Sequence, residues 1–238
     1  MIFVFDGRTK VSDYVDTIWR TQSDDAGGSF ISTAASNWEI VVTKQNGGIN
    51  LTVRGPETIA MSAPVPKDAD FLGISFKLGT FMPHLPATQL VNGGLNLPEA
   101  SSKSFWLQGS AWPFPDYDNA DVFVDRLIRE GLLVRDELVE AALQDQPQYA
   151  SIRTVRRRFL QVTGVTHKTI QQIERARQAA ALLQQGKPIL DTVYEAGYFD
   201  QAHMTKSLKH FMGQTPTQIL RPSEADAEQT SFNLTGNR

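Results

Sequence analysis

The chain has 238 residues, of which 41% are hydrophobic and 21% are charged, and it carries a net charge of −3. This length suits two domains and this composition suits a folded protein, so we expect two modest hydrophobic cores. The absence of cysteine excludes disulfides, thiol catalysis and thiolate metal sites. The longest apolar runs, 2–5 and 179–183, are far shorter than a membrane span of about 20 residues, and no secretory signal is evident. We therefore expect a cytoplasmic protein without a membrane partner.

Charge is distributed unevenly along the chain. Residues 151–222 contain 11 basic and 4 acidic residues, whereas residues 1–120 contain 8 and 12, and residues 121–150 contain 3 and 7. A basic segment in an otherwise acidic chain can attract phosphates locally and limit indiscriminate binding. An ordinary solvated helix face would show the same excess, so charge alone leaves both interpretations open.

Residues 1–120 show the pattern of a β-rich domain. Residues 38–42 and 49–53 are rich in β-branched and apolar side chains, and the Gln-Asn-Gly-Gly sequence at 45–48 suits a tight turn between them. This pattern predicts a β-hairpin. Residues 71–76 predict a further strand with its large apolar residues on one face.

An aromatic segment at residues 105–117 closes this part of the chain. It contains two Trp, two Phe, one Tyr and two Pro. Because aromatic side chains often line small-molecule pockets, Trp106 and Trp112 are our candidate ligand-binding residues. The alternative interpretation is a rigid linker packed against the domain.

After residue 121 the apolar spacing becomes helical, and an internal repeat with an offset of 49 residues follows. Each copy begins with a good N-cap, Ser151 or Asp200, and ends at a glycine, Gly164 or Gly213. Each copy also carries three apolar residues with the spacing of one buried helix face. These are Val155, Phe159 and Val162 in the first copy and Met204, Leu208 and Phe211 in the second.

A helix predicted from Pro188 to Gly197 precedes the second copy, with a tight turn between them. This is the helix-turn-helix arrangement, in which the second helix enters the major groove of DNA. A longer helix over residues 168–185 joins the two copies and ends at Gly186. The residues off the buried stripes are rich in Arg, Lys and Gln, which can contact bases and phosphates.

Five motifs follow one another in this part of the chain: Ser151-Ile-Arg-Thr-Val-Arg-Arg-Arg-Phe159, Thr163-Gly164, Ala180 with Leu182-Leu183 and Gly186, Gly197-Tyr-Phe-Asp-Gln-Ala-His203, and Gly213-Gln-Thr-Pro216. In this order and spacing they resemble the DNA-binding domain of the AraC/XylS family of bacterial transcription regulators. The resemblance implies two helix-turn-helix units bridged by a long helix. It also implies that both recognition helices lie on one face of the DNA, in adjacent segments of the major groove.

The resemblance assigns particular residues to DNA. The base-reading positions fall on Arg153, Arg156 and Arg157 in the first unit and on Gln201, Ala202, His203 and Lys206 in the second. Ala202 can offer only an apolar contact, as to a thymine methyl group. Lys168 and Lys209 are our candidate phosphate contacts. One departure from the family is a longer turn at residues 145–150, where Pro147 cannot lie inside a helix without a kink, so the geometry of the first unit stays open.

The front part is more distantly similar to the β-rich sensory domains that this family places before its DNA-binding part. The predicted fold class is therefore α+β. A mostly β domain at residues 1–120, a cupin-like barrel or sandwich, precedes an all-α domain at residues 121–222 with two helix-turn-helix units. An acidic tail at residues 223–238 lacks apolar periodicity and is predicted to be disordered.

These observations predict a sequence-specific DNA-binding transcription regulator, controlled by a small molecule bound to the front domain. The alternative is a DNA-binding regulator whose front domain only dimerises or binds another protein. Double-stranded DNA is the predicted partner, and RNA polymerase, a small-molecule effector and a second copy of the chain (a homodimer) are further candidates.

Nothing in the sequence predicts an enzyme. The front part has one histidine, His84, whereas a metal site of the small-barrel enzymes needs two or three converging imidazoles. A nucleophile elbow, a phosphate loop and a dinucleotide fingerprint are also missing. We therefore expect no catalytic residue, no metal and no cofactor.

Overall fold

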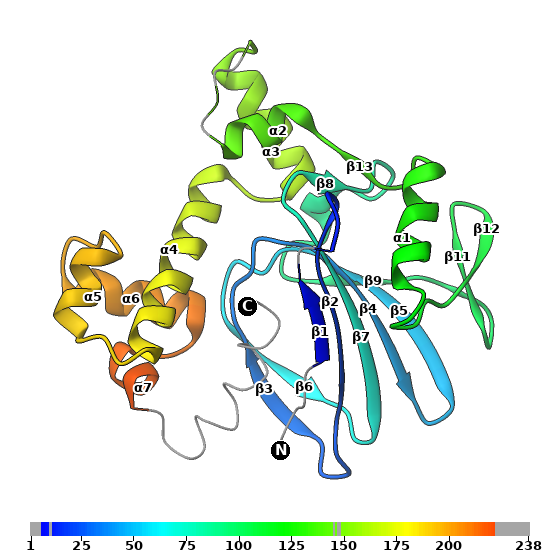
Figure 1. The fold of residues 1–238 in the computed structure, drawn as a ribbon, viewed down its shortest axis with the longest axis horizontal. Helices are drawn as coiled ribbons and strands as arrows, with labels where there is room; N and C mark the ends of the chain where they lie inside the picture. Colours follow the sequence, from blue (N-terminus) through cyan, green and yellow to red (C-terminus); the bar gives the residue numbers. More distant parts are fainter. Residues whose placement is uncertain (1–5, 10, 145, 147–148, 222–238) are drawn as a thin grey trace.

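The computed structural model describes residues 6–9, 11–144, 146 and 149–221 (Figure 1). Strands form the first part of the chain and helices the last part, which confirms the α+β fold class. Pro147 and the tail predicted at residues 223–238 lie outside the described residues.

The largest sheet has six antiparallel strands in the order β1-β2-β7-β4-β5-β9. In that order, the strands are Asp6–Thr9, Val15–Gln22, Ala69–Phe76, Glu39–Gln45, Gly48–Arg54 and Gly94–Asn96. The predicted hairpin is confirmed as β4 and β5, because Val42 lies opposite Leu51 and the turn residues Asn46 and Gly47 have positive φ angles. Strands β1 and β9 form the two edges, so the sheet is open. Of the two folds predicted for this part, the sandwich fits and the closed barrel does not.

One face of the six-stranded sheet forms the core of the front region. Ile18, Ile74 and Ile40 lie side by side on β2, β7 and β4, and all three are buried. This face packs against a three-stranded sheet and a helix through Phe105, Trp112 and other apolar residues. The covering elements are β10 (Glu99–Ser101), β11 (Ser104–Leu107), β12 (Ser110–Pro113) and α1 (Ala120–Arg129).

Helix α1 belongs to the front region. Its Phe123 and Leu127 are buried in the same cluster as the residues of the six-stranded sheet. Strand β13 (Val134–Arg135) follows and pairs with β8 (Thr80–Phe81). We therefore propose that the front domain extends to residue 135 rather than ending at residue 120.

Two small elements lie on the side of the front domain that faces the helices. Strands β3 (Gly28–Ser32) and β6 (Met61–Val65) form a separate two-stranded sheet near α6 and α7 (Figure 1). The short helix η1 (Ala87–Gln89) lies against the end of α3. These elements bring the front domain into contact with the helical region.

The helical region contains α2 to α7 (Figure 1). Their bounds are α2 (Glu137–Leu143), α3 (Ile152–Thr163), α4 (His167–Gln184), α5 (Ile189–Glu195), α6 (Gln201–Met212) and α7 (Pro216–Leu220). The apolar residues form two separate clusters, one around α2 and α3 and one around α4 to α7. Within the described ranges, no helix combines the length and apolar character needed to cross a membrane.

Candidate DNA interface

Two helix-turn-helix units have equivalent ends. Helices α2 and α3 form the first unit and helices α5 and α6 the second. Ser151 and Asp200 each accept a hydrogen bond from the backbone N–H three residues later, at 3.2 and 2.7 Å. Helix α3 ends at Gly164 and α6 at Gly213, with φ angles of 78° and 74°. The caps and stops predicted from the repeat are therefore confirmed.

The buried faces of the two recognition helices also follow the repeat. Phe159 and Val162 of α3 are buried, and Val155 is half-buried. Their counterparts on α6, Met204, Leu208 and Phe211, are all buried. The opposite face of each helix is therefore left exposed.

On α3, the three predicted base-reading arginines are exposed. They are Arg153, Arg156 and Arg157. In the part of the chain that the structure describes, none of the three is paired with a carboxylate. A guanidinium in this state can donate two parallel hydrogen bonds to guanine. Arg156 and Arg157 lie one helical turn after Arg153, so the three can reach neighbouring base pairs.

Arg158 has a different role from its two neighbours in sequence. Its Nε donates to the carboxylate of Asp136, and its guanidinium lies 5.5 Å from the ring centroid of Phe81. Asp136 is only 7% exposed and also caps α2, because its Oδ1 accepts a hydrogen bond from the backbone N–H of Val139 at 2.9 Å. Arg158 therefore stabilises the first unit, whereas Arg156 and Arg157 stay exposed.

On α6, four of the predicted interface residues lie along one groove. A shallow groove along this helix is lined by Gln201, Ala202, Thr205, Lys206 and Lys209. His203 is exposed but is not among the residues that line this groove, and its ring lies 5.1 Å from that of Tyr198 in an edge-on arrangement. Of the four base-reading positions predicted in the second unit, the groove therefore holds Gln201, Ala202 and Lys206, together with Lys209. Lys168 is exposed in the first turn of α4, beyond the end of α3.

Tyr198 supports the turn before α6, a role that the sequence did not reveal. The side chain is buried, and its hydroxyl lies 2.8 Å from Ser207 Oγ on α6. Burial raises the pKa of Tyr198, so the phenol stays protonated at neutral pH. The only sequence signal was its place between Gly197 and Phe199 in the turn.

Residues 149–222 match the model of a family described as a helix-turn-helix domain. This segment runs from just before α3 to the end of α7 and contains both capped recognition helices. Residues 149–222 are an AraC-type helix-turn-helix domain. A search of curated proteins finds no match to the chain.

Two solved structures are similar to the AraC-type domain and the front domain taken together. One is a structure of ToxT from Vibrio cholerae, 11% identical, with 91% of this chain and 97% of that chain covered and a TM-score of 0.38. The other is ToxT from Vibrio cholerae O395 bound to (E)-4-(8-methylnaphthalen-1-yl)but-3-enoic acid, 12% identical, with 91% and 98% covered and a TM-score of 0.39.

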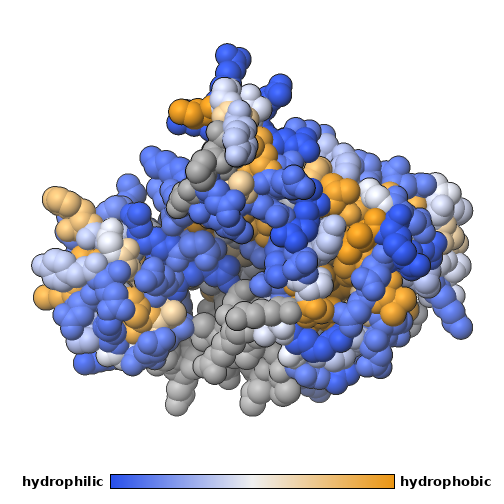
Figure 2. Space-filling view, turned by 45° about the horizontal axis from the view of Figure 1, so that its top comes forward, coloured by the Kyte–Doolittle hydropathy of each residue, from blue (hydrophilic) through white to orange (hydrophobic). Residues whose placement is uncertain are grey.

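The second unit exposes three large apolar side chains. Leu190 and Tyr194 on α5 and Phe199 in the turn are 61%, 80% and 90% exposed. Figure 2 shows hydrophobic residues at the left edge of the molecule, where the helices of the second unit lie. Helix α5 therefore packs against its own unit mainly through Val193 and Ala196, which are buried.

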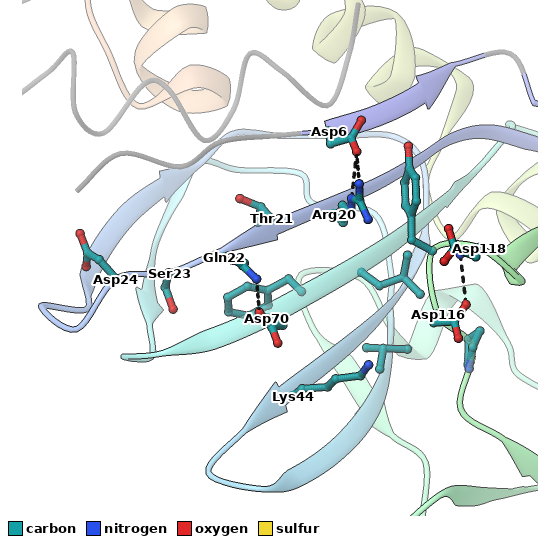
Figure 3. A pocket seen from close by; sticks show the side chains of 15 residues that line it. Asp6, Arg20, Thr21, Gln22, Ser23, Asp24, Lys44, Asp70, Asp116 and Asp118 are labelled. Carbon is teal, nitrogen blue, oxygen red and sulfur yellow. Dashed lines mark hydrogen bonds and ion pairs between the residues drawn. The ribbon is translucent and has the colours of Figure 1, made fainter.

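The front domain contains a cavity of about 720 Å³ at one end of the six-stranded sheet (Figure 3). Gln22, Asp70 and Lys44 lie in a row on β2, β7 and β4, and Gln22 Nε2 donates to Asp70 at 2.7 Å. Val42 and Leu72 supply an apolar wall. The lining contains five aspartates against one arginine and one lysine, so the cavity is acidic.

The two tryptophans predicted to bind a ligand lie elsewhere. Trp112 is fully buried in the front core, with Phe123 edge-on and the guanidinium of Arg126 3.9 Å from its ring centroid. Trp106 is 46% exposed on β11. Neither lines the cavity of Figure 3. The structure therefore places Trp112 in packing against α1, as in the alternative interpretation of the aromatic segment.

The described residues also contain no group of three or more His, Asp or Glu side chains that could hold a metal ion. His84 is partly buried, and burial lowers its pKa, which favours a neutral imidazole.

Proposed function

We propose that this chain is a transcription regulator that reads DNA sequence with α3 and α6 in adjacent segments of the major groove. The observation that carries the proposal is the pair of equivalent recognition helices, each with a buried face and an opposite face of exposed Arg, Lys and Gln. The segment that holds them has a large basic excess in an otherwise acidic chain. Such a surface binds phosphates without sequence preference, and the base-reading side chains add the preference.

The roles of individual residues follow from their chemistry. Arg153, Arg156 and Arg157 are suited to guanine, and Gln201 is suited to adenine. Lys206 is a point charge that contacts a phosphate or a single base acceptor. In the same proposal, Ala202 meets a thymine methyl and His203 a base edge, whereas Lys168 and Lys209 neutralise phosphates.

Selection of bound genomic fragments tests this function. The purified chain is mixed with sheared DNA from its host, and the retained fragments are sequenced. We expect a shared motif with two half-sites about one helical turn apart, and binding that weakens steeply with salt. The double variant Arg157→Ala with Lys206→Ala should lose the motif, whereas Arg129→Ala, an exposed arginine on α1, should retain it. Retained fragments without any common motif would refute the proposal.

We further propose that a small-molecule effector binds the front domain in the cavity of Figure 3 rather than beside the two tryptophans. Its volume lies within the range of about 300–1,000 Å³ typical of ligand sites, and it combines an apolar wall with polar groups. Its acidic lining favours a ligand that carries a positive charge.

Native mass spectrometry of chain isolated from its host tests the effector. We expect a co-purified small molecule, which the variant Asp70→Trp should exclude because the exposed Asp70 lines the cavity and its replacement fills that space. The matched control Asp16→Asn, outside the cavity lining, should retain it. If no small molecule is found and the chain is dimeric in solution, the front domain serves dimerisation instead. RNA polymerase is a candidate partner only because the proposed function is transcription regulation.

A further inference from the structure

Both recognition helices end against the front domain, and they do so at equivalent positions of the repeat. A Cβ atom on Gly164 would lie 2.8 Å from the carbonyl oxygen of Ala87, and one on Gly213 would lie 2.8 Å from Cγ2 of Ile31. The Gly213 position is also 3.3 Å from Cβ of Ala60. The front domain therefore approaches the C-terminal ends of α3 and α6 too closely for any side chain to fit between them.

The front domain also supplies hydrogen bonds that α6 cannot make for itself. The last carbonyl groups of a helix have no partner within the helix. In this chain, the backbone N–H of Ala60 donates to the carbonyl of His210 at 2.9 Å, and that of Ala34 donates to the carbonyl of Phe211 at 2.7 Å. Ser36 Oγ adds a hydrogen bond to Glu174 of α4 at 3.0 Å.

The hydrophobic cores of both units include residues of the front domain. Ala34 is fully buried in the cluster of the second unit. Leu78, Phe81 and Val91 pack against the cluster of the first unit. Neither unit therefore has a core made only of its own helices.

Helix α4 by itself provides only a weak connection between the two units. Only Ile170, in its first turn, belongs to the cluster of the first unit, whereas its buried residues from Ile173 to Leu183 belong to the cluster of the second. The front domain contacts both units, and the reading faces stay exposed on both helices.

From these contacts we infer that Ala34, Ala60 and Ala87 are positioning residues for DNA recognition. The front domain holds the ends of α3 and α6 at a set separation, and the docked arrangement is the one that binds DNA. The front domain thereby determines which spacing of half-sites the regulator accepts. This inference rests on the proposed DNA-binding function.

The first test measures affinity for duplexes in which zero to five base pairs are inserted between the selected half-sites. Five inserted base pairs rotate the second half-site by about half a turn. The affinity of the wild-type chain should therefore fall by about 100-fold, which is less than the usual ratio of specific to non-specific affinity. Ala60→Leu combined with Ala87→Leu should displace the helix ends and reduce that loss to about tenfold or less. Preference at single bases within each half-site should not change.

Ala111→Leu is the matched control, because Ala111 is exposed on β12, on the far side of the front domain from α6 (Figure 1). It should keep the wild-type response to spacing. A folded double variant that also keeps the wild-type response would overturn the inference and assign the spacing to α4. A wild-type chain that binds the motif but tolerates every spacing would overturn it as well, with the proposed function intact. No motif at all would refute both.

A disulfide provides a second test that does not depend on the leucine variants folding. The chain has no cysteine, so Ala60→Cys with Gly213→Cys can form one bridge only. Ile31→Ala is included in the same variant because it removes the methyl group that a side chain at position 213 would meet. The two Cβ positions are 3.3 Å apart, close to the range of about 3.5–4.5 Å found in disulfides. We expect the bridge to form, and the oxidised chain to bind the motif with wild-type spacing. Failure of the bridge to form, or loss of binding on oxidation with recovery on reduction, would show that the docked arrangement is not the DNA-binding one.

Discussion

Replacing Arg157 with Ala removes an exposed guanidinium that is unpaired with any carboxylate of the described residues. A bidentate contact between arginine and guanine contributes about 1–3 kcal/mol of discrimination. The affinity for the selected duplex should therefore fall by about 5- to 150-fold, and the preference at one base pair should relax. Because the side chain contributes nothing to a core, the free energy of unfolding should change by less than about 0.5 kcal/mol.

Arg158→Ala is the neighbouring variant with the opposite expectation. It leaves the carboxylate of Asp136, which is only 7% exposed, without its charged partner. An unsatisfied buried group costs about 1–3 kcal/mol, and we expect the lower half of that range because the Arg158 side chain is itself 40% exposed. The melting temperature should fall by about 2–6 °C, whereas base preference should stay as in the wild type.

Two measurements on the same preparations decide between these expectations. Urea unfolding reports the stability of each variant, and binding to a panel of duplexes with single-base changes reports its preference. If Arg157→Ala retained the wild-type preference at every base pair, α3 would not be a recognition helix as assigned. If Arg158→Ala relaxed the preference without loss of stability, the two arginines would have been assigned in the wrong order.

Three further outcomes are expected. Lys206→Ala should weaken binding about equally for all duplexes and lower the slope of log affinity against log salt by about one, because a single phosphate contact is lost. Asp136→Asn should lose only the pairing with Arg158, whereas Asp136→Ala should also lose the N-cap of α2 and about 1 kcal/mol more in urea unfolding. Burial, together with Glu57, raises the pKa of Glu39 against the opposing effect of Arg54. The folded chain therefore binds the carboxyl proton of Glu39 more tightly than the unfolded chain does. The contribution of Glu39 to the free energy of unfolding falls as the pH rises from the pKa of the unfolded chain to that of the folded chain. Glu39→Gln should therefore raise the free energy of unfolding at pH 7, and this increase should disappear near pH 4.

The helical region could be predicted closely because its signals are local. An N-cap, a glycine stop and an apolar stripe act within one or two helical turns, so Ser151, Asp200 and Phe159 were identifiable without any tertiary information. The same applies to the hairpin of β4 and β5, where turn residues and alternation specify the pairing.

Predictions that depended on contacts between distant segments were less accurate. Helix α1 looks like the start of the helical domain in sequence, yet Phe123 and Leu127 pack into the core of the front domain. An aromatic residue in a loop-rich segment can equally line a pocket or fill a core, and only the tertiary packing places Trp112 in the core. The cavity of Figure 3 is lined by polar residues from strands far apart in the chain, so no single segment revealed it.

The glycines that end the recognition helices satisfy two requirements, and only one of them is visible in the sequence. A helix stop needs a residue that accepts a positive φ, which asparagine also tolerates. Gly213 additionally needs to have no side chain, since Ile31 and Ala60 lie against it, whereas Gly186 has a φ of 84° and open space around it. Gly213→Asn should therefore lower the free energy of unfolding by about 1–3 kcal/mol, the usual cost of overpacking, and Gly186→Asn by about 0.5 kcal/mol or less. Equal effects of the two substitutions in urea unfolding would mean that the backbone requirement alone explains both glycines, and that the front domain does not press against the end of α6 in solution.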